Sequence, residues 1–405
     1  MNISYHTLPN GLRLVHLMTR NQVAWCGLAV NAGSRDELDG HFGLAHFVEH
    51  TIFKGTKHRR AWHILNRMER VGGELNAYTT KEGTMLYSVF PEQHLPRAVE
   101  LLADLVQWSI FPKEELDRER DVVLEEAASY RDTPSDAVYD DFEDLLFAGS
   151  ELGHNILGRK EDLEQLTQDD CMRYLKALYV PSNMAFFSVG PERPERVFRL
   201  AERYFGGMSH TMVPRHRQQP LETAPFKRVI TIGTHQAHTI VGARVPDMSH
   251  PLRYALMLLN NILGGPGMNS LLNVELRERR GYVYTVESTL SMLSDCGWLE
   301  IYLGCDPDDV RSSLRVIERI TSRLSQERLP DRRLDAYKKQ YCGQLVVAAD
   351  STEFMAMRAG RGLLYHGKVT TIDETIERIQ AVTPDEIAQA AAFLHADRLS
   401  SLTFQ

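Results

Sequence analysis

The sequence predicts an α+β fold of two related domains, each an antiparallel-rich sheet packed with helices. A chain of 405 residues is too long for one ordinary hydrophobic core, so two domains of roughly 200 residues each are expected. Strand-like and helix-like segments occur in both halves. A strand, a turn with Pro and acidic residues, and an amphipathic helix occur once per half, at 86–102 and 300–317.

The first half begins with a predicted hairpin, Ser4–Thr7 and Leu12–Leu17, around a Pro-Asn-Gly turn. Further strands of this half are predicted at residues 23–30, 75–79, 84–90 and 185–190. Helical periodicity covers residues 42–54, 60–71, 93–109, 113–131, 134–147 and 192–205. The order of these segments predicts one sheet with several covering helices.

A linker is predicted between the halves, because 206–225 contains two Gly, three Pro and no apolar periodicity. We therefore expect a first domain at 1–207, a linker at 208–226 and a related domain at 227–405. The strands expected after the linker are 229–232, 239–245, 282–289 and 298–304. The helices expected there are 251–263, 270–279 and 307–325.

Charge and composition exclude some classes of protein. The net charge of −8 and a pI near 6.1 argue against nucleic-acid binding, which favours a basic surface. Apolar stretches stay well below the ~18 residues that span a bilayer, and the N-terminal MNISYHTLPNGL does not resemble a signal peptide. The five cysteines are odd in number and scattered, which is typical of reduced thiols. We expect a cytoplasmic protein without membrane or nucleic-acid partners.

The pattern HFVEH at residues 46–50 carries the strongest chemical signal. Positions i and i+4 of a helix face the same side, so His46 and His50 can bind one zinc ion. Glu49 points to nearly the same side and is placed to act as a general base on water activated by the metal. The order H-x-x-E-H is an inverted zinc-peptidase signature.

Two histidines and a glutamate also occur on solvated polar helix faces. Apolar neighbours distinguish the two interpretations here, because Leu44, Phe47, Val48 and Ile52 predict a helix that is buried. Buried imidazole and carboxylate groups need partners, and a metal ion is one. The flanking residues therefore favour a metal site.

A catalytic zinc commonly has three protein ligands and leaves one position open. In helix 114–130 the candidates for the third ligand are Glu119, Glu125 and Glu126. Glu119 and Glu126 lie seven residues apart and share a helix face, whereas Glu125 is turned away by about 100°. Spacing alone leaves Glu119 and Glu126 both open, one as ligand and the other orienting it.

The second half contains a glycine-rich turn at 263–267 (LGGPG), which lacks a Walker lysine and does not fit G-x-G-x-x-G, so nucleotide binding is rejected. Arg277 and Tyr284 follow it. Such side chains can stabilise an oxyanion. By spacing alone, the sequence favours a surface arginine and a packed strand tyrosine over such a role.

The chain resembles the inverted-zinc-motif metallopeptidases, the family of pitrilysin, insulin-degrading enzyme and the mitochondrial processing peptidase. The resemblance covers most of the chain and rests on six motifs in order. They are LPNGLRLV (8–15), AGSRDE (32–37), GLAHFVEHTIFKGT (43–56), GGELNAYTTKEGTMLY (72–87), ERDVVLEE (119–126) and LGGPGMNSLLNVELRERRGYVYTV (263–286).

The resemblance implies a role for each matching residue. His46, His50 and Glu126 would be the zinc ligands, Glu49 the base, and Glu119 the accessory glutamate. Asn76 and Ala77 match the segment that positions substrate against a sheet edge. Arg277 and Tyr284 match the pair that acts at the zinc site from the domain that lacks a metal motif. The glycine turn departs from the family's usual GGGMSSRL at Pro266 and at 269–272.

The resemblance also implies the assembly. Short bacterial members pair two chains into a clamshell, each chain forming one half, around a closed chamber. Because this chain carries both the metal motif and the Arg/Tyr pair, a homodimer is expected. The predicted function is a zinc-dependent metalloendopeptidase that hydrolyses extended or unfolded peptides. The alternatives are a catalytically inactive subunit and a peptide-binding scaffold whose zinc is structural.

Overall fold

The computed structural model describes residues 2–213 and 217–405, and these residues form two compact units. Unit 1 comprises residues 1–127, 154–217 and 349–370, apart from the residues outside the description, and unit 2 comprises 128–153, 218–348 and 371–405. Two segments thus group with the unit opposite to the one expected from their place in the sequence. They are 128–153, in unit 2, and 349–370, in unit 1.

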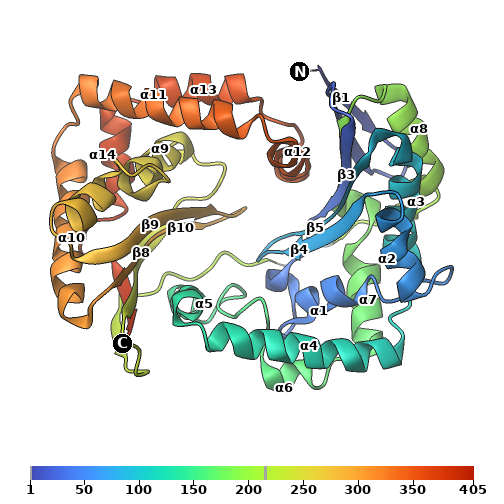
Figure 1. Cartoon of the computed structure of the whole chain (residues 1–405), viewed down its shortest axis with the longest axis horizontal. Helices are drawn as coiled ribbons and strands as arrows, with labels where there is room; N and C mark the ends of the chain where they lie inside the picture. The colour runs from blue at the N-terminus through green and yellow to red at the C-terminus, as the bar shows by residue number, and fades with distance from the viewer. Residues whose placement is uncertain (1, 214–216) are drawn as a thin grey trace. The chain divides into compact units, whose positions relative to one another are not determined.

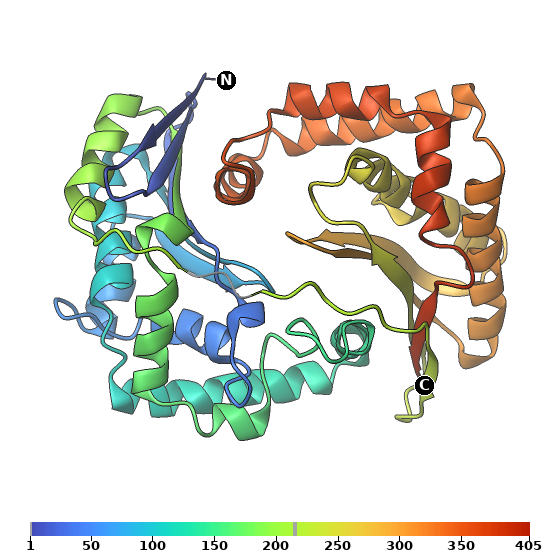
Figure 2. The same ribbon diagram turned by 180° about the vertical axis from the view of Figure 1, so that it is seen from behind.

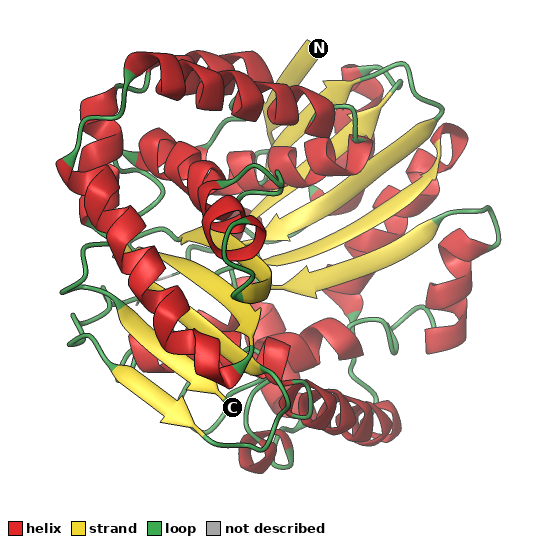
Figure 3. Cartoon of the chain, turned by 60° about the vertical axis from the view of Figure 1, so that its left-hand side comes forward, coloured by secondary structure: helices red, strands yellow, loops and turns green. Residues whose placement is uncertain are grey.

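Unit 1 is built on a six-stranded sheet with the order β1-β2-β6-β3-β5-β4 (Figures 1 and 3). Its strands are β1 (Asn2–Thr7), β2 (Arg13–Met18), β3 (Val23–Val30), β4 (Glu74–Thr79), β5 (Thr84–Pro91) and β6 (Met184–Gly190). The pairings are antiparallel except that of β2 with β6, which is parallel. The hairpin of β1 and β2 leaves β1 at one edge (Figure 2), and β4 forms the other.

Both faces of this sheet are covered. The helices of unit 1 are α1 (Leu44–Thr51), α2 (Ala61–Glu69), α3 (Leu95–Trp108), α4 (Lys113–Arg131, which crosses the boundary to unit 2), α6 (Lys160–Leu163), α7 (Gln168–Leu178), α8 (Pro194–Phe205) and α12 (Thr352–His366). Phe186 of β6 packs against Phe205 of α8, whereas the next residue, Phe187, lies against α12. Because successive strand residues face opposite sides, α8 and α12 cover opposite faces. Burial of every residue of β6 follows from this arrangement.

Unit 2 contains a five-stranded sheet with the order β7-β11-β8-β10-β9. Its strands are β7 (Lys227–Ile230), β8 (Ala237–Val245), β9 (Val283–Met292), β10 (Gly297–Cys305) and β11 (Ser400–Phe404). Its helices are α5 (Pro134–Leu146), α9 (Arg253–Gly264), a π-helix (Asn273–Glu278), α10 (Val310–Gln326), α11 (Asp331–Ala348), α13 (Ile372–Ala381) and α14 (Pro384–Ala392). Short 3-10 turns in the two units cover Ser34–Asp36, Glu92–His94, Pro181–Asn183 and Pro307–Asp309.

Unit 2 has separate cores on the two faces of its sheet. Ile240 of β8 packs with Phe142 of α5 and with Leu402 of β11. Val241, the next residue, belongs to the core with α9, α10 and α14. Helix α5 therefore covers one face alone, as α12 does in unit 1.

Five strands of each sheet share one topology. The order β2-β6-β3-β5-β4 in unit 1 corresponds to β7-β11-β8-β10-β9 in unit 2. In both sheets the first two strands of this order are parallel and every later pairing is antiparallel. The predicted α+β fold class with two related sheets packed by helices is confirmed.

Most predicted helices and strands are present, and one predicted α-helix is a π-helix in the structure. The helix expected at 270–279 forms as a π-helix over Asn273–Glu278. Part of the expected linker, residues 214–216, lies outside the described residues. The division into functional domains at 1–207, 208–226 and 227–405 stays a prediction.

Candidate metal centre and catalytic site

Helix α1 presents the HFVEH residues on a short, well-anchored helix. Its apolar side, including Leu44, Phe47 and Val48, packs into the core of unit 1. Gly43 precedes the helix with φ of 95°, a left-handed conformation that glycine adopts easily. A Cβ at Gly43 would also lie 2.8 Å from the carbonyl oxygen of Leu157. The helix therefore starts at a fixed point, and of its two histidines His46 is buried and His50 half-buried.

Three side chains converge at one point. The Nε2 atoms of His46 and His50 lie 3.1 Å apart. The Oε2 atom of Glu126, on α4, lies 3.4 Å from Nε2 of His50 and 3.9 Å from Nε2 of His46. Tetrahedral ligands at the ~2.0–2.1 Å typical of zinc are separated from one another by roughly 3.3 Å. The observed separations are close to that value.

The chemistry of these donors also fits zinc. Burial, with a smaller contribution from the neighbouring His50, lowers the pKa of His46 to about 3. His46 is therefore neutral at neutral pH, as a nitrogen ligand must be. Within residues 2–213 and 217–405, His46, His50 and Glu126 make up the one group of His, Cys, Asp or Glu ligand atoms lying within 4.8 Å of each other. Two imidazoles and one carboxylate leave a tetrahedral position open.

Glu119 orients His50 from its other ring nitrogen. Its Oε1 lies 3.1 Å from Nδ1 of His50, and its Oε2 lies 2.6 Å from Nζ of Lys54. Because the carboxylate accepts, the proton of a neutral His50 is on Nδ1, which leaves the Nε2 lone pair free for a metal. Glu125 is exposed on α4. The structure therefore brings Glu126 and Glu119 to the histidines and not Glu125.

Glu49 lies outside the three-ligand group. Thr79 Oγ1, at the end of β4, donates a hydrogen bond of 2.6 Å to its Oε2. Burial is the largest effect on its pKa and raises it, Glu126 adds to the rise, and Thr79 and His50 oppose it. A carboxyl with a raised pKa close to a metal site is suited to act as a general base.

The predicted substrate segment is on an edge strand. Asn76 and Ala77 pair with Tyr87 and Leu86 of β5, and β4 is the last strand of the sheet among the described residues. An edge strand can accept an extended peptide as a further strand through backbone hydrogen bonds. The same strand ends at Thr79, which contacts Glu49.

Arg277 and Tyr284 belong to unit 2. Arg277 is exposed on the π-helix. Tyr284 is 53% exposed on β9, the edge strand of the second sheet, and its hydroxyl donates to Asp306 Oδ2 at 3.1 Å. That hydrogen bond is the main cause of the raised pKa of Tyr284. The Tyr284 hydroxyl is a donor at neutral pH.

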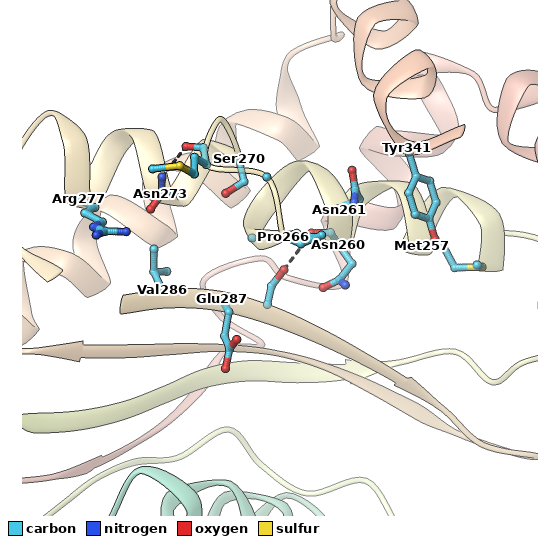
Figure 4. A pocket seen from close by; sticks show the side chains of 15 residues that line it. Met257, Asn260, Asn261, Pro266, Ser270, Asn273, Arg277, Val286, Glu287 and Tyr341 are labelled. Atoms are coloured by element: carbon cyan, nitrogen blue, oxygen red, sulfur yellow. Dashed lines mark hydrogen bonds between the residues drawn. The ribbon is translucent and has the colours of Figure 1, made fainter. Parts of the chain in front are cut away.

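The glycine-rich turn borders a cavity of about 480 Å³ in unit 2 (Figure 4). Arg277 lies at one end of this cavity and Tyr341 of α11 lies at the other. The close packing explains the glycines, because a Cβ at Gly264 would lie 2.6 Å from the backbone nitrogen of Ser288. The turn thus follows the C-terminus of α9 and leads into the π-helix.

Sequence reasoning missed two residues that contact the site, Lys54 and Thr79, and two that lie at the start of α1, Glu37 and His154. Lys54 lies three residues beyond α1, within a motif already noted for the resemblance. Glu37 and Thr79 lie in motifs already noted for the resemblance, but their partners are set by tertiary structure. His154 has no local signal at all.

Comparison with known proteins identifies the class. The chain matches the family description "Insulinase (Peptidase family M16)" over residues 14–160 and "Peptidase M16 inactive domain" over residues 165–341. It is 33% identical over 393 residues to an uncharacterized zinc protease of Streptomyces coelicolor, covering 95% of this chain and 85% of that protein. It is 32% identical over 387 residues to an uncharacterized zinc protease of Bacillus subtilis, covering 95% and 94%.

Crystal structures show the same fold. A protease from Helicobacter pylori superposes with a TM-score of 0.94 at 22% identity, covering 100% of this chain and 99% of that one. A peptidase M16 inactive domain from Pseudomonas fluorescens gives 0.92 at 18% identity, covering 100% and 98%. The sequence comparisons define a member of a peptidase family, and the crystal structures show its fold. The chain belongs to peptidase family M16 and is a short member of the bacterial type, as the sequence motifs predicted.

The membrane prediction concerns the length and hydropathy of the helices. None of those in the described parts of the chain combines the length and apolarity that a bilayer crossing requires.

Proposed function

We propose that this chain is a zinc-dependent metalloendopeptidase. The observation that carries the proposal is the division of roles at the site. His46, His50 and Glu126 converge as a three-ligand group, while Glu49 stands beside them, outside the group, at the end of an edge strand. Structural zinc sites usually have four protein ligands, and the group found within the described residues has three.

The ligands would hold zinc, which when bound supplies a Lewis acid that polarises a peptide carbonyl and activates water. Glu49 accepts the proton of the attacking water, which its raised pKa favours, and then passes that proton to the leaving amine. Thr79 keeps the Glu49 carboxylate in place through its hydrogen bond. Glu119 holds the ring of His50 in the required tautomer.

The substrate in this proposal is an extended or unfolded peptide. Backbone groups of Asn76 and Ala77, on the edge strand β4, pair with it as an added strand. Since Thr79 on the same strand contacts Glu49, a peptide aligned on β4 is led toward the base. Arg277 and Tyr284 serve as donors to the substrate carbonyl or the developing oxyanion. Support for this last role comes from the family motif and from the exposure of both side chains.

Further parts of the proposal concern the assembly. A homodimer enclosing a chamber and a cytoplasmic location follow from the resemblance to short bacterial members and from the reduced cysteines. Five free cysteines are present, four of them buried. Sedimentation of the purified protein tests the dimer.

The test is cleavage of a mixed peptide library by purified protein, with and without a chelator, and with zinc added back. We expect cleavage that the chelator abolishes and zinc restores. The alternative of an inactive scaffold has a specific basis, because one solved relative is described as an inactive domain. Peptide binding without any cleavage, in zinc-loaded protein, would support that alternative and contradict the proposal.

A further inference from the structure

The N-terminus of α1 is capped from a distance. The first backbone N–H groups of a helix have no partners within the helix, and the residue before α1, Gly43, has no side chain to offer. Glu37 supplies the missing acceptors. Its Oε2 accepts from the Gly43 nitrogen at 2.9 Å and its Oε1 accepts from the Ala45 nitrogen at 2.7 Å. A carboxylate at this end also interacts favourably with the helix dipole.

Glu37 is itself held by His154. The Glu37 side chain is fully buried, and Nε2 of His154 lies 3.0 Å from its Oε2. The same Nε2 lies 3.1 Å from the carbonyl oxygen of Ser34. Because both partners are acceptors, Nε2 carries the proton. Phe42, just before the helix, stacks on the His154 ring with centroids 4.1 Å apart.

The backbone around this contact leaves little room for movement. A Cβ at Gly158 would lie 2.3 Å from the carbonyl oxygen of Phe42, and one at Gly43 would lie 2.9 Å from the Cα of Gly158. The segment 154–158 therefore packs directly against the start of α1. All three of His46, Glu49 and His50 are on this one helix of eight residues. The orientation of the first turn of α1 therefore sets the positions of both histidines and of Glu49.

We propose that Glu37 and His154 form a positioning pair that fixes the angle and rotation of α1 and so aligns His46 and His50 with Glu126 of α4. Neither residue is part of the ligand group, so both act through α1. The proposal rests on the proposed zinc site. It adds that the zinc affinity and the ligand geometry of this site depend on Glu37, a buried residue outside α1 that caps the helix.

The decisive variant is Glu37→Gln in the full chain. Glutamine has nearly the same shape but one acceptor oxygen, so in either amide orientation its NH₂ group faces a backbone N–H. We expect the folded variant to bind zinc about tenfold more weakly in a competition assay with a chelating dye. With Co²⁺ as probe, its visible absorption spectrum should differ from that of the wild type, because the ligand angles change.

His154 provides a graded second test that does not depend on the folding of Glu37→Gln. His154→Leu removes the donor and should weaken zinc binding, whereas His154→Gln keeps a donor and should restore part of the affinity. Ser351→Ala is the matched control. It removes the hydrogen bond that Ser351 Oγ accepts from the Phe354 nitrogen, which caps α12 in the same unit. It should lower the melting temperature and leave zinc affinity and the cobalt spectrum unchanged.

Wild-type zinc affinity and cobalt spectrum in Glu37→Gln, or in His154→Leu where Glu37→Gln does not fold, would overturn the positioning role. Equal losses of affinity in Ser351→Ala would also overturn it, since general destabilisation would then explain the effect. None of these readouts requires peptide cleavage. An inactive wild-type protein that still binds zinc would contradict the proposed function and leave the positioning pair testable.

Discussion

Helices α1 and α9 occupy corresponding places in two sheets of the same topology. Helix α1 lies in the connection from β3 to β4, and α9 lies in the connection from β8 to β9. Both bury an apolar side in the core of their own unit. On its other residues α1 carries two histidines and a glutamate, whereas α9 carries Asn260 and Asn261. The two helices therefore share their apolar sides, and the proposed metal chemistry depends on a few side chains of α1 and α4.

Of the substitutions proposed for testing, that of Glu49 on α1 should lower peptide turnover the most. Glu49→Gln should keep zinc and fold but lower kcat about a thousandfold, because a positioned general base contributes roughly 10²–10⁴-fold. Metal content and peptide turnover are measured on the same sample. Turnover within a factor of a few of wild type, with zinc retained, would show that α1 lacks the base assigned to it.

The three glutamates of α4 should differ in their effect on zinc affinity according to their contacts with His50. Glu126→Gln should weaken zinc binding by about a hundredfold or more, Glu119→Gln by about tenfold, and Glu125→Gln should leave it unchanged. The order follows from the distances to His50, since Oε2 of Glu126 faces Nε2 and Oε1 of Glu119 faces Nδ1. Zinc affinity is measured by competition with a chelator. A larger loss for Glu125→Gln than for Glu126→Gln would contradict the assignment on this helix.

Unit 2 should contribute to turnover without contributing to metal binding. Tyr284→Phe removes one exposed hydroxyl and should lower kcat by about ten- to a hundredfold at unchanged zinc content. Tyr282→Phe, two residues away and packed against the core of unit 2, is the matched control and should retain activity. Full activity of Tyr284→Phe would mean that the second sheet has no catalytic donor at this position.

Burial of His46 should make the metal-free protein sensitive to acid. Since the folded state holds the pKa of His46 at about 3, below its ordinary 6.5, the unfolded state binds more protons below about pH 6.5. The stability that depends on neutral His46 is thus present above about pH 6.5 and is lost progressively as the pH falls toward about 3. At about pH 5 the loss reaches about 2 kcal/mol.

Urea unfolding of chelated protein at about pH 7 and about pH 5 measures this loss. His46→Gln does not titrate in this range and should lose about 2 kcal/mol less than the wild type between the two pH values. An identical acid dependence in the variant would refute the assigned pKa shift. The corresponding helix α9 has no histidine, so it offers no comparable titration.

The sequence was sufficient for the fold class and for the residues on α1, because helical periodicity and the HFVEH spacing are local. It did not predict where α5 and α12 pack. Helix α5 comes from the first half of the chain but covers the sheet of unit 2, and α12 comes from the second half but covers the sheet of unit 1. No helix or strand was predicted within residues 326–405, yet they contain β11, an inner strand of the second sheet. Contacts of this kind depend on tertiary packing.

At the candidate site too, residues close in sequence could be predicted and contacts between distant residues could not. Spacing left Glu119 and Glu126 open as ligands, and the folded geometry places both near His50 on different ring nitrogens. Thr79 and His154 were missed because their partners lie 30 and 117 residues away. No pattern in a single sequence connects such positions.

The most direct test of the central claim is the location and number of bound metal ions. Crystals of zinc-loaded wild-type protein, measured with X-rays above and below the zinc absorption edge, should show one anomalous peak per chain between His46, His50 and Glu126. Crystals of His50→Ala should show none. A full-strength peak at this position in His50→Ala, or a wild-type peak elsewhere in the chain, would contradict the account.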